Sequence, residues 1–258
     1  MNAHPTAIVS PQARLACSVT VGAYSIIGRD VILDEDCEVM SHVVIDGRTK
    51  AGKQNRFFPF ASIGLPPQDL KYQGEPTAVE IGDENTFRES VTVHRGTAEG
   101  GGTTRIGNQN LLMAYVHIAH DCTLGNGVIM GNGASLAGHV EIGDQATVGP
   151  FCGIHQFTRI GAFSFLGPYT IVNRDILPYS KTTAPRPMEV LGVNRIGLER
   201  RGLTRQDLDD LEAAFRLLCR SKLNTTQALE AIEQRSLQSP HVRALVEFVR
   251  SSERGVAK

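Results

Sequence analysis

The chain has 258 residues, 41% of them apolar, and its 26 Lys and Arg balance 27 Asp and Glu. This composition is typical of a folded globular protein and argues against a disordered chain or a basic nucleic-acid-binding protein. There is no apolar run of the roughly 20 residues that a membrane span needs and no signal peptide, and five scattered cysteines without CxxC spacing predict reduced thiols in a cytoplasmic protein.

A six-residue repeat organises the first two thirds of the chain. Every sixth residue is apolar over 9–63, 81–93 and 106–172, which makes 25 apolar residues in 25 steps. Glycine often follows the apolar residue, and we expect it to permit a backbone corner. Such repeats mark a parallel β-helix, whose left-handed form has three hexapeptides, or about 18 residues, in each coil. We therefore predict a mainly β fold, with a left-handed parallel β-helix over residues 1–185.

Two interruptions of the repeat predict loops that leave the coil. Residues 65–80 contain the pair Pro66-Pro67 and lose the apolar period, and residues 94–105 contain three consecutive glycines. Proline pairs and glycine runs are typical of turns and loops. Loops that project from a regular scaffold commonly carry binding groups, so both segments are candidates for part of a site.

The last part of the chain, residues 186–258, has a helical pattern and predicts a C-terminal α-helical domain. Thr204, with Asp207 three residues later, forms a helix-start signal, and Pro240 fits the first turn of the last helix. Besides the helix that begins at Thr204, we expect helices over about 187–201, 225–235 and 239–251. The segment has 13 Lys and Arg against 10 Asp and Glu, so it is the basic end of the chain.

Five of the eight histidines lie between residues 94 and 155. In coils of 18 residues, segments 119–121, 137–139 and 155–157 stack in one stripe, with neighbouring coils about 4.8 Å apart. The side chains expected to line this groove, with His117 at its edge, are those of His120, Asp121, His139, His155 and Gln156. Cys122 lies beside the stripe, but it occupies a small inward position and is predicted to belong to the core.

Two chemistries fit such a cluster. In acyl transfer, His120 would accept a proton from a hydroxyl, Asp121 would orient the ring, and the Gly138 N–H would bind an oxyanion. Alternatively, three histidines would bind zinc, as in the γ-class carbonic anhydrases that share the coiled fold. A non-catalytic scaffold, the third interpretation, would need neither the loop at 65–80 nor a polar stripe.

These segments closely resemble the UDP-N-acetylglucosamine O-acyltransferases that begin lipid A synthesis in Gram-negative bacteria. The resemblance covers essentially the whole chain and is carried by residues 68–77, 88–97, 117–122, 136–140, 155–157 and 200–202. It implies a cytoplasmic homotrimer with active sites between subunits. The implied reaction moves a 3-hydroxyacyl group from acyl carrier protein to the glucosamine 3-hydroxyl of UDP-N-acetylglucosamine. It implies no metal, no other cofactor, no membrane span and no nucleic-acid partner.

The resemblance also implies roles for single residues. His120 matches the catalytic base, Asp121 holds its ring, and Gly138 matches the oxyanion donor. The substrate-binding residues that match, or lie beside a match, are Gln68, Asp69, Lys71, His117, His139, His155, Gln156, Asn194, Arg200 and Arg201.

Three features concern the acyl donor or depart from the family pattern. Phe165 and Pro168 lie where acyl length is set, and Pro168 replaces a residue that is often glycine. Ile196 stands where the family often has an acidic residue at the nucleotide end. We expect the acidic carrier protein to dock at the basic helical end, near Arg216, Arg220 and Lys222.

Overall fold

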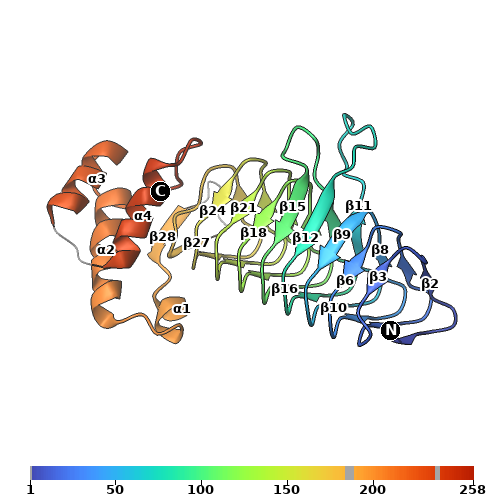
Figure 1. Cartoon of the computed structure of the whole chain (residues 1–258). Coiled ribbons are helices and arrows are strands. Elements are labelled where there is room, and N and C mark those ends of the chain that lie inside the picture. Colours follow the sequence, from blue (N-terminus) through green and yellow to red (C-terminus); the bar gives the residue numbers. More distant parts are fainter. Residues whose placement is uncertain (1, 184–188, 236–238) are drawn as a thin grey trace.

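The computed structural model describes residues 2–183, 189–235 and 239–258. Three sheets form the sides of a prism of stacked coils, and the helices lie at its C-terminal end (Figure 1). This is the left-handed parallel β-helix that the hexapeptide repeat predicts.

From β1 to β27, strands that follow one another in the chain belong to different sheets, so each coil contributes one short strand to each side. The eleven-stranded sheet contains β1 (Asn2–Ala3), β4 (Thr20–Val21), β7 (Glu38–Val39), β10 (Arg56–Phe57), β13 (Thr86–Phe87), β16 (Leu111–Leu112), β19 (Ile129–Met130), β22 (Thr147–Val148), β25 (Phe165–Leu166), β27 (Ser180–Thr183) and β28 (Glu189–Val193). The nine-stranded sheet contains β2 (Ile8–Val9), β5 (Ile26–Ile27), β8 (Val44–Ile45), β11 (Ser62–Leu65), β14 (Thr92–His94), β17 (His117–Ile118), β20 (Ser135–Leu136), β23 (Gly153–Ile154) and β26 (Ile171–Val172). The eight-stranded sheet contains β3 (Arg14–Leu15), β6 (Ile32–Leu33), β9 (Arg48–Ala51), β12 (Ala78–Ile81), β15 (Thr103–Ile106), β18 (Thr123–Leu124), β21 (Glu141–Ile142) and β24 (Arg159–Ile160).

The pairing register gives the length of one coil. Ile8 pairs with Ile26, so a coil takes 18 residues, as predicted. The spacing grows to 30 residues between Ile63 and Val93 and to 25 between Val93 and Ile118. The excess over one coil is 12 and 7 residues, and it corresponds to two loops that leave the coil before β12 and before β15. Beyond them the spacing returns to 18, as between Ile118 and Leu136.

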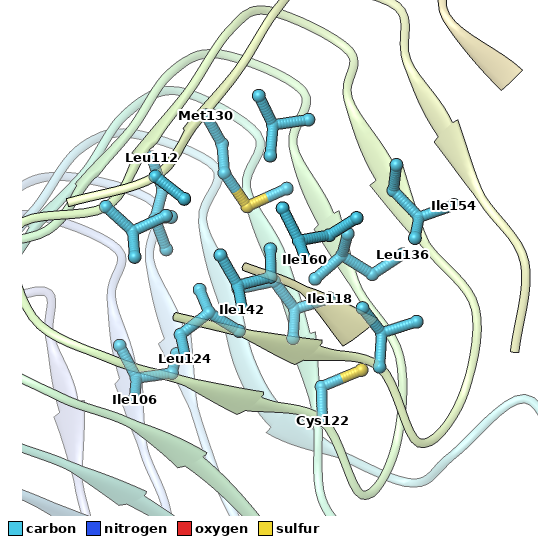
Figure 2. Close-up of a cluster of buried hydrophobic side chains, with 14 of the residues drawn as sticks. Ile106, Leu112, Ile118, Cys122, Leu124, Met130, Leu136, Ile142, Ile154 and Ile160 are labelled. Atoms are coloured by element: carbon cyan, nitrogen blue, oxygen red, sulfur yellow. The ribbon is translucent and has the colours of Figure 1, made fainter. Parts of the chain in front are cut away.

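The apolar residue of each hexapeptide points into the prism. Figure 2 shows these side chains stacked coil upon coil, for example Leu124, Ile142 and Ile160. All three are at least 97% buried, and burial of one such side chain stabilises the fold by roughly 1.5–3 kcal/mol. Cys122 is fully buried among them, which confirms its predicted place in the core, and burial raises the pKa of its thiol to about 12.

The prediction that the repeated glycines permit the corners is wrong. Among the described residues, seventeen that are not glycine have φ between 55° and 67°, whereas glycines such as Gly22 and Gly143, which follow the apolar residue, have no positive φ. They are needed because the next coil is close. A Cβ at Gly22 would lie 2.7 Å from the backbone carbon of Met40, and one at Gly143 would lie 2.6 Å from the nitrogen of Ala162.

The C-terminal segment contains α1 (Arg195–Arg200), α2 (Arg205–Cys219), α3 (Thr225–Gln234) and α4 (Pro240–Arg250). Thr204 and Asp207 form the predicted capping box. The helix predicted over 187–201 is wrong in its first part, because β28 pairs there antiparallel with β27, and Gly192 has a non-helical φ of 136°; residues 187 and 188 lie outside the described residues. No helix in the described part of the chain is long and apolar enough to cross a membrane.

The end of the chain returns to the prism and fastens the helices to it. The buried Asp175 side chain accepts hydrogen bonds from the Arg159 N–H at 2.9 Å and the Ser252 hydroxyl at 2.8 Å. Its backbone forms a bridge with Val256. The Arg159 guanidinium also lies 4.5 Å from the centre of the Phe248 ring in α4. The last coil is therefore covered by the chain's own C-terminus.

Candidate active site

The corner after β17 carries a hydrogen-bonded His–Asp pair. His120 Nδ1 lies 2.8 Å from Asp121 Oδ2. The Asp121 side chain is completely buried, whereas 16% of the His120 side chain is exposed. Because a carboxylate can only accept hydrogen bonds, the proton lies on Nδ1, and Nε2 is the basic nitrogen of the ring.

The loop after β14 encloses the Asp121 carboxylate. The Thr97 N–H donates to both carboxylate oxygens, at 3.0 and 3.1 Å, and the Thr97 hydroxyl donates to Oδ2 at 2.6 Å. A Cβ at Gly100 would lie 2.1 Å from Oδ2, so only glycine lets this loop approach so closely. Thr97 is not among the predicted site residues. The sequence feature that could have indicated its role is the glycine-rich segment around it, Gly96 and the run 100–102.

The predicted stacking of segments 119–121, 137–139 and 155–157 is confirmed by hydrogen bonds between consecutive coils, but Asp121, His139 and Gln156 do not line the groove there. The His139 N–H donates to the His120 carbonyl at 3.1 Å, and the Phe157 N–H donates to the Gly138 carbonyl at 3.2 Å. The His139 ring lies edge-on to His120 at 5.2 Å and stacks on Phe157 at 4.4 Å. Burial lowers the pKa of His139, so this ring is neutral at pH 7.

Gly138 lies directly beside the His120 imidazole. A Cβ at this position would lie 2.5 Å from His120 Cε1 and 2.8 Å from Nε2, so any side chain would push the ring aside. Gly138 is the first residue of its corner, a place that Pro150 and Pro168 occupy in other coils. The corner therefore does not need an N–H there. No group among the described residues accepts from the Gly138 N–H, which leaves it free to bind an oxyanion.

A groove of about 550 Å³ runs along the nine-stranded sheet past this pair. Its floor is made of small residues on β20, on β23 and between them, including Ser135, Ala137 and Gly153. A Cβ at Gly153 would lie 3.2 Å from Ile171 Cδ1, so even alanine would narrow the floor. The predicted site residues that line this groove are Gln68, His117, His120, Gly138 and His155.

Two further histidines lie at the N-terminal side of the groove. His117 Nδ1 lies 2.7 Å from the Thr92 hydroxyl, and its ring meets the buried His94 edge-on at 5.0 Å. Burial lowers the pKa of both rings, and the neighbouring His117 and His120 lower that of His94 further, to about 4. His94 Nδ1 has no hydrogen-bond partner among the described residues.

Because His94 is buried and neutral, we expect the folded protein to be less stable in acid. Its pKa in the folded protein, about 4, is below the ordinary 6.5, so between these values the unfolded chain binds a proton that the folded chain does not. The free energy of unfolding should therefore fall by up to about 3 kcal/mol as pH drops from 6.5 to 4, and stop falling on this account below that. Denaturant titrations of wild type, His94→Gln and, as a control, His4→Gln measure this. An equal fall in all three would contradict the assignment to His94.

The loop before β12 carries three predicted residues to different places. Gln68 lines the groove. Asp69 lies near enough to His139 for its charge to favour the protonated ring, although burial outweighs that effect. Lys71 points elsewhere and pairs with Glu99 of the second loop at 3.2 Å. Gln156 is exposed and does not line the groove, and its carbonyl lies 3.1 Å from His155 Nδ1.

Most of the remaining predicted residues lie on another side of the prism. A second cavity of about 460 Å³ opens on the eleven-stranded sheet, and the predicted residues that line it are Phe165, Asn194, Arg200 and Arg201. Ile196 also lines it and is 64% exposed. Pro168 is at an exposed corner between β25 and β26. Within one chain, the structure therefore separates Phe165 and the nucleotide-end residues from the groove of His120.

The His–Asp cluster also has the composition of a metal site. Ligand atoms of His120, Asp121 and His139 lie within 4.8 Å of one another. Zinc accepts histidine nitrogen and carboxylate oxygen, and a catalytic zinc has three protein ligands. However, the Asp121 carboxylate already accepts hydrogen bonds from Thr97 and His120, and a metal would have to compete with those donors.

Coils of hexapeptides with a His–Asp pair beside a free backbone N–H define a hexapeptide-repeat acyltransferase. Residues 103–138 match the family of bacterial transferase hexapeptides, over six repeats. Residues 175–257 match the second domain of UDP-N-acetylglucosamine O-acyltransferase. The chain belongs to the family of UDP-N-acetylglucosamine O-acyltransferases.

Full-length relatives support this assignment. An acyl-[acyl-carrier-protein]–UDP-N-acetylglucosamine O-acyltransferase from Saccharophagus degradans is 48% identical over 99% of this chain and 98% of its own length. One from Thermodesulfovibrio yellowstonii is 44% identical with the same coverage. The crystal structure of UDP-N-acetylglucosamine O-acyltransferase from Moraxella catarrhalis matches with a TM-score of 0.97 and 40% identity, over all of both chains.

Proposed function

We propose that this protein transfers a 3-hydroxyacyl group from acyl carrier protein to the glucosamine 3-hydroxyl of UDP-N-acetylglucosamine, the first step of lipid A biosynthesis. The observation that carries the proposal is the groove lined by His120 and Gly138, with the buried Asp121 carboxylate hydrogen-bonded to the His120 ring. The relatives that match over their full length are named for this activity. The reaction needs no cofactor, and its place is the cytoplasm.

His120 acts as the general base. Its Nε2 takes the proton of the 3-hydroxyl as that oxygen attacks the thioester carbonyl carbon. The resulting oxyanion is held by the Gly138 N–H, which has no other acceptor among the described residues. When the tetrahedral intermediate collapses, the C–S bond breaks, and the imidazolium returns its proton to the departing thiolate. Asp121 keeps the ring oriented and stabilises its charged form throughout.

The other site residues bind the sugar nucleotide and position the acyl group. Gln68, His117 and His155 line the groove, and we assign them, with Asp69, Lys71, His139 and Gln156, to the glucosamine, its acyl substituent and the adjoining phosphate. Asn194, Arg200 and Arg201 line the second cavity. Guanidinium groups suit a diphosphate because they make paired, charge-assisted hydrogen bonds.

A homotrimer would reunite the two halves of this site. The groove opens on the nine-stranded sheet and the second cavity on the eleven-stranded sheet, so one chain cannot present both to one substrate. In a closed ring, unlike faces of neighbouring copies meet. Three copies arranged in this way would bring each groove against a neighbour's Arg200 and Arg201.

The surface of the nine-stranded sheet supports such an assembly. Its outward strand residues carry no formal charge: Ile8, Ile26, Val44, Ser62, Thr92, His117, Ser135, Gly153 and Ile171. The eight-stranded sheet instead exposes charged residues, with ion pairs Arg105–Glu80 and Arg159–Glu141. An uncharged face with exposed Ile8 and Ile171 is typical of a surface that another subunit covers.

The donor protein is expected to dock at the basic end of α2. Arg216 and Arg220 line a cavity of about 380 Å³ between α2 and β28. Reversing both to glutamate should raise the KM for the acyl carrier protein about tenfold or more at low salt, and less at high salt, since screening weakens charge steering. The KM for the nucleotide sugar should not change. Arg235→Glu, at the end of α3, is the control, and an unchanged carrier KM in the double variant would exclude this patch.

The acyl-length assignment is testable at two positions. We propose that Pro168 limits the groove for the acyl chain, so Pro168→Gly should favour donors that are longer by one or more methylenes. Each buried methylene is worth about 0.8 kcal/mol, or roughly fourfold in kcat/KM. Phe165→Ala tests the second position separately. Competition between donors of several lengths measures the preference, and identical profiles in wild type and both variants would place the limit elsewhere.

The decisive experiment is a radiolabelled acyl-transfer assay. Purified protein is incubated with UDP-N-acetylglucosamine and acyl carrier proteins that carry 3-hydroxyacyl chains of several lengths. We expect a product acylated on the glucosamine 3-oxygen, formed equally well after chelator treatment. Because His120, Asp121 and His139 could hold zinc, metal content is measured on the same protein. Stoichiometric zinc together with loss of activity on chelation would favour the zinc hydratase.

A further inference from the structure

Two loops that leave the prism meet at one arginine. Arg95 follows β14, and its N–H donates to the Leu65 carbonyl at 3.2 Å. Its Nη1 donates to the Gly64 carbonyl at 3.0 Å, at the place where the first loop begins. Its Nε donates to the hydroxyl of Tyr72 in that loop at 2.9 Å, and the guanidinium lies 5.5 Å from the centre of the Tyr72 ring.

Tyr72 in turn organises the first loop. Its hydroxyl donates to the Glu75 carbonyl at 2.8 Å and also accepts the hydrogen bond from Arg95 Nε. The Tyr72 hydroxyl therefore links Arg95 to the C-terminal part of the loop. Its backbone N–H donates to the Asp69 carbonyl at 3.1 Å, in the turn that carries Asp69 and follows Gln68. The place of the tyrosine ring therefore fixes the turn that presents Gln68 to the groove.

Arg95 is also the first residue of the second loop. Gly96 follows it, and then Thr97, which donates to the Asp121 carboxylate. Arg95 thus connects the loop at the substrate groove with the loop around the catalytic pair. A further contact between the loops, the Lys71–Glu99 ion pair, leaves 74% and 79% of the two side chains exposed, and such pairs contribute little.

We propose that Arg95 and Tyr72 are positioning residues for the acceptor substrate: together they hold the loop of Gln68 and Asp69 in register with His120. This inference rests on the proposed acyl transfer, because it assigns Gln68 and Asp69 to the sugar nucleotide. Neither residue touches the reacting atoms. Their loss should therefore weaken acceptor binding more than the chemical step.

Two conservative variants remove the contact without removing bulk. Tyr72→Phe keeps the ring and deletes the hydroxyl, and Arg95→Lys keeps the charge and deletes the guanidinium donors Nε–H and Nη1–H. Each should raise the KM for UDP-N-acetylglucosamine about tenfold, since the loss of a hydrogen bond to a charged group has an effect of that order. The kcat should change less than about threefold, and the KM for acyl carrier protein should not change. The double variant should raise the KM by less than the product of the two single effects, because both variants break the shared Arg95–Tyr72 contact, although each also loses one bond of its own.

A second readout does not depend on turnover. Hydrogen exchange of residues 66–76 should accelerate in both variants, while exchange of the coils stays as in wild type. Arg56→Lys is the matched control, because Arg56 also pairs through its Nε, with Glu38 at 3.0 Å, and lies 5.2 Å from the Phe58 ring, away from both loops.

Two outcomes would overturn the proposal. Unchanged acceptor KM and unchanged exchange in both variants would show that the contact does not hold the loop. A fall in kcat with an unchanged KM would show that Arg95 acts only on the side of Thr97 and Asp121. If the wild-type protein transfers no acyl group, the proposed function fails, and the exchange measurement still decides whether Arg95 and Tyr72 hold the loop.

Discussion

Replacing His120 by alanine is expected to lower kcat for acyl transfer by about 10²–10⁴-fold, the usual effect of losing a positioned general base. His120 Nδ1 is committed to Asp121, which leaves Nε2 as the nitrogen that can take the acceptor's proton. His139, edge-on at 5.2 Å, is not placed to replace it, because it does not line the groove. Steady-state kinetics with both substrates saturating measures the change.

The matched control is His42→Ala. His42 also occupies a corner with positive φ, but it lies between the rings of Tyr24 and Phe60 in the first coils. This variant should keep wild-type kcat, and both variants should keep the circular dichroism of the coil. Near-wild-type turnover in a folded His120→Ala protein would remove His120 from the mechanism.

Asp121→Asn should lower kcat by about 10³–10⁴-fold with little change in fold. The carboxylate accepts from the Thr97 N–H, the Thr97 hydroxyl and His120 Nδ1. An amide replaces one acceptor oxygen by an NH₂ donor, and it has no negative charge to stabilise the imidazolium. Either the NH₂ group faces the ring, which then takes the other tautomer with its proton on Nε2, or the amide oxygen faces the ring, which keeps its tautomer but loses the stabilising charge.

Asp83→Asn is the control for this substitution. Asp83 also accepts from a backbone N–H at a corner, that of Lys53 at 2.8 Å, but it has no histidine beside it. It should retain wild-type kcat. If Asp121→Asn keeps more than about a tenth of wild-type kcat, the orienting role is excluded. The pH profile gives a second check, since a wrong tautomer lowers kcat at every pH.

The fold could be predicted because the hexapeptide period is visible in the sequence as one apolar residue in every six. One apolar side chain per six residues requires a coil whose interior takes one side chain per strand, and Ile118, Leu136 and Ile154 stack accordingly. The period also places His120 and His139 side by side without knowledge of any contact. The period does not show how closely consecutive coils approach. It therefore predicts the wrong reason for the glycines that follow the apolar residues: they allow the close approach of the next coil and do not form the corners.

Contacts made by the loops could not be predicted from the period. Thr97 reaches Asp121 only because the second loop folds back over its own coil, and no repeat specifies that path. In the same way, β28 has the composition of a helix start but is held extended by pairing with β27. The separation of Phe165 and Arg201 from the groove follows from which side of the prism each strand joins, a property of three-dimensional closure.

The stacking of coils makes the molecule nearly one-dimensional in its energetics. From β1 to β26, each strand pairs only with the strand on the same side of the coil before or the coil after, so stability is close to a sum of nearest-neighbour terms. Unfolding of such a stack of coils starts at an end, because a terminal coil pairs with only one neighbouring coil. The C-terminal end is fastened through Asp175, and the first coil, with β1, β2 and β3 as free edges, is not. We therefore expect the coils to open first at the N-terminus. The coils that carry His120 and His139 lie several coil–coil interfaces further along the stack, and we expect them to stay closed.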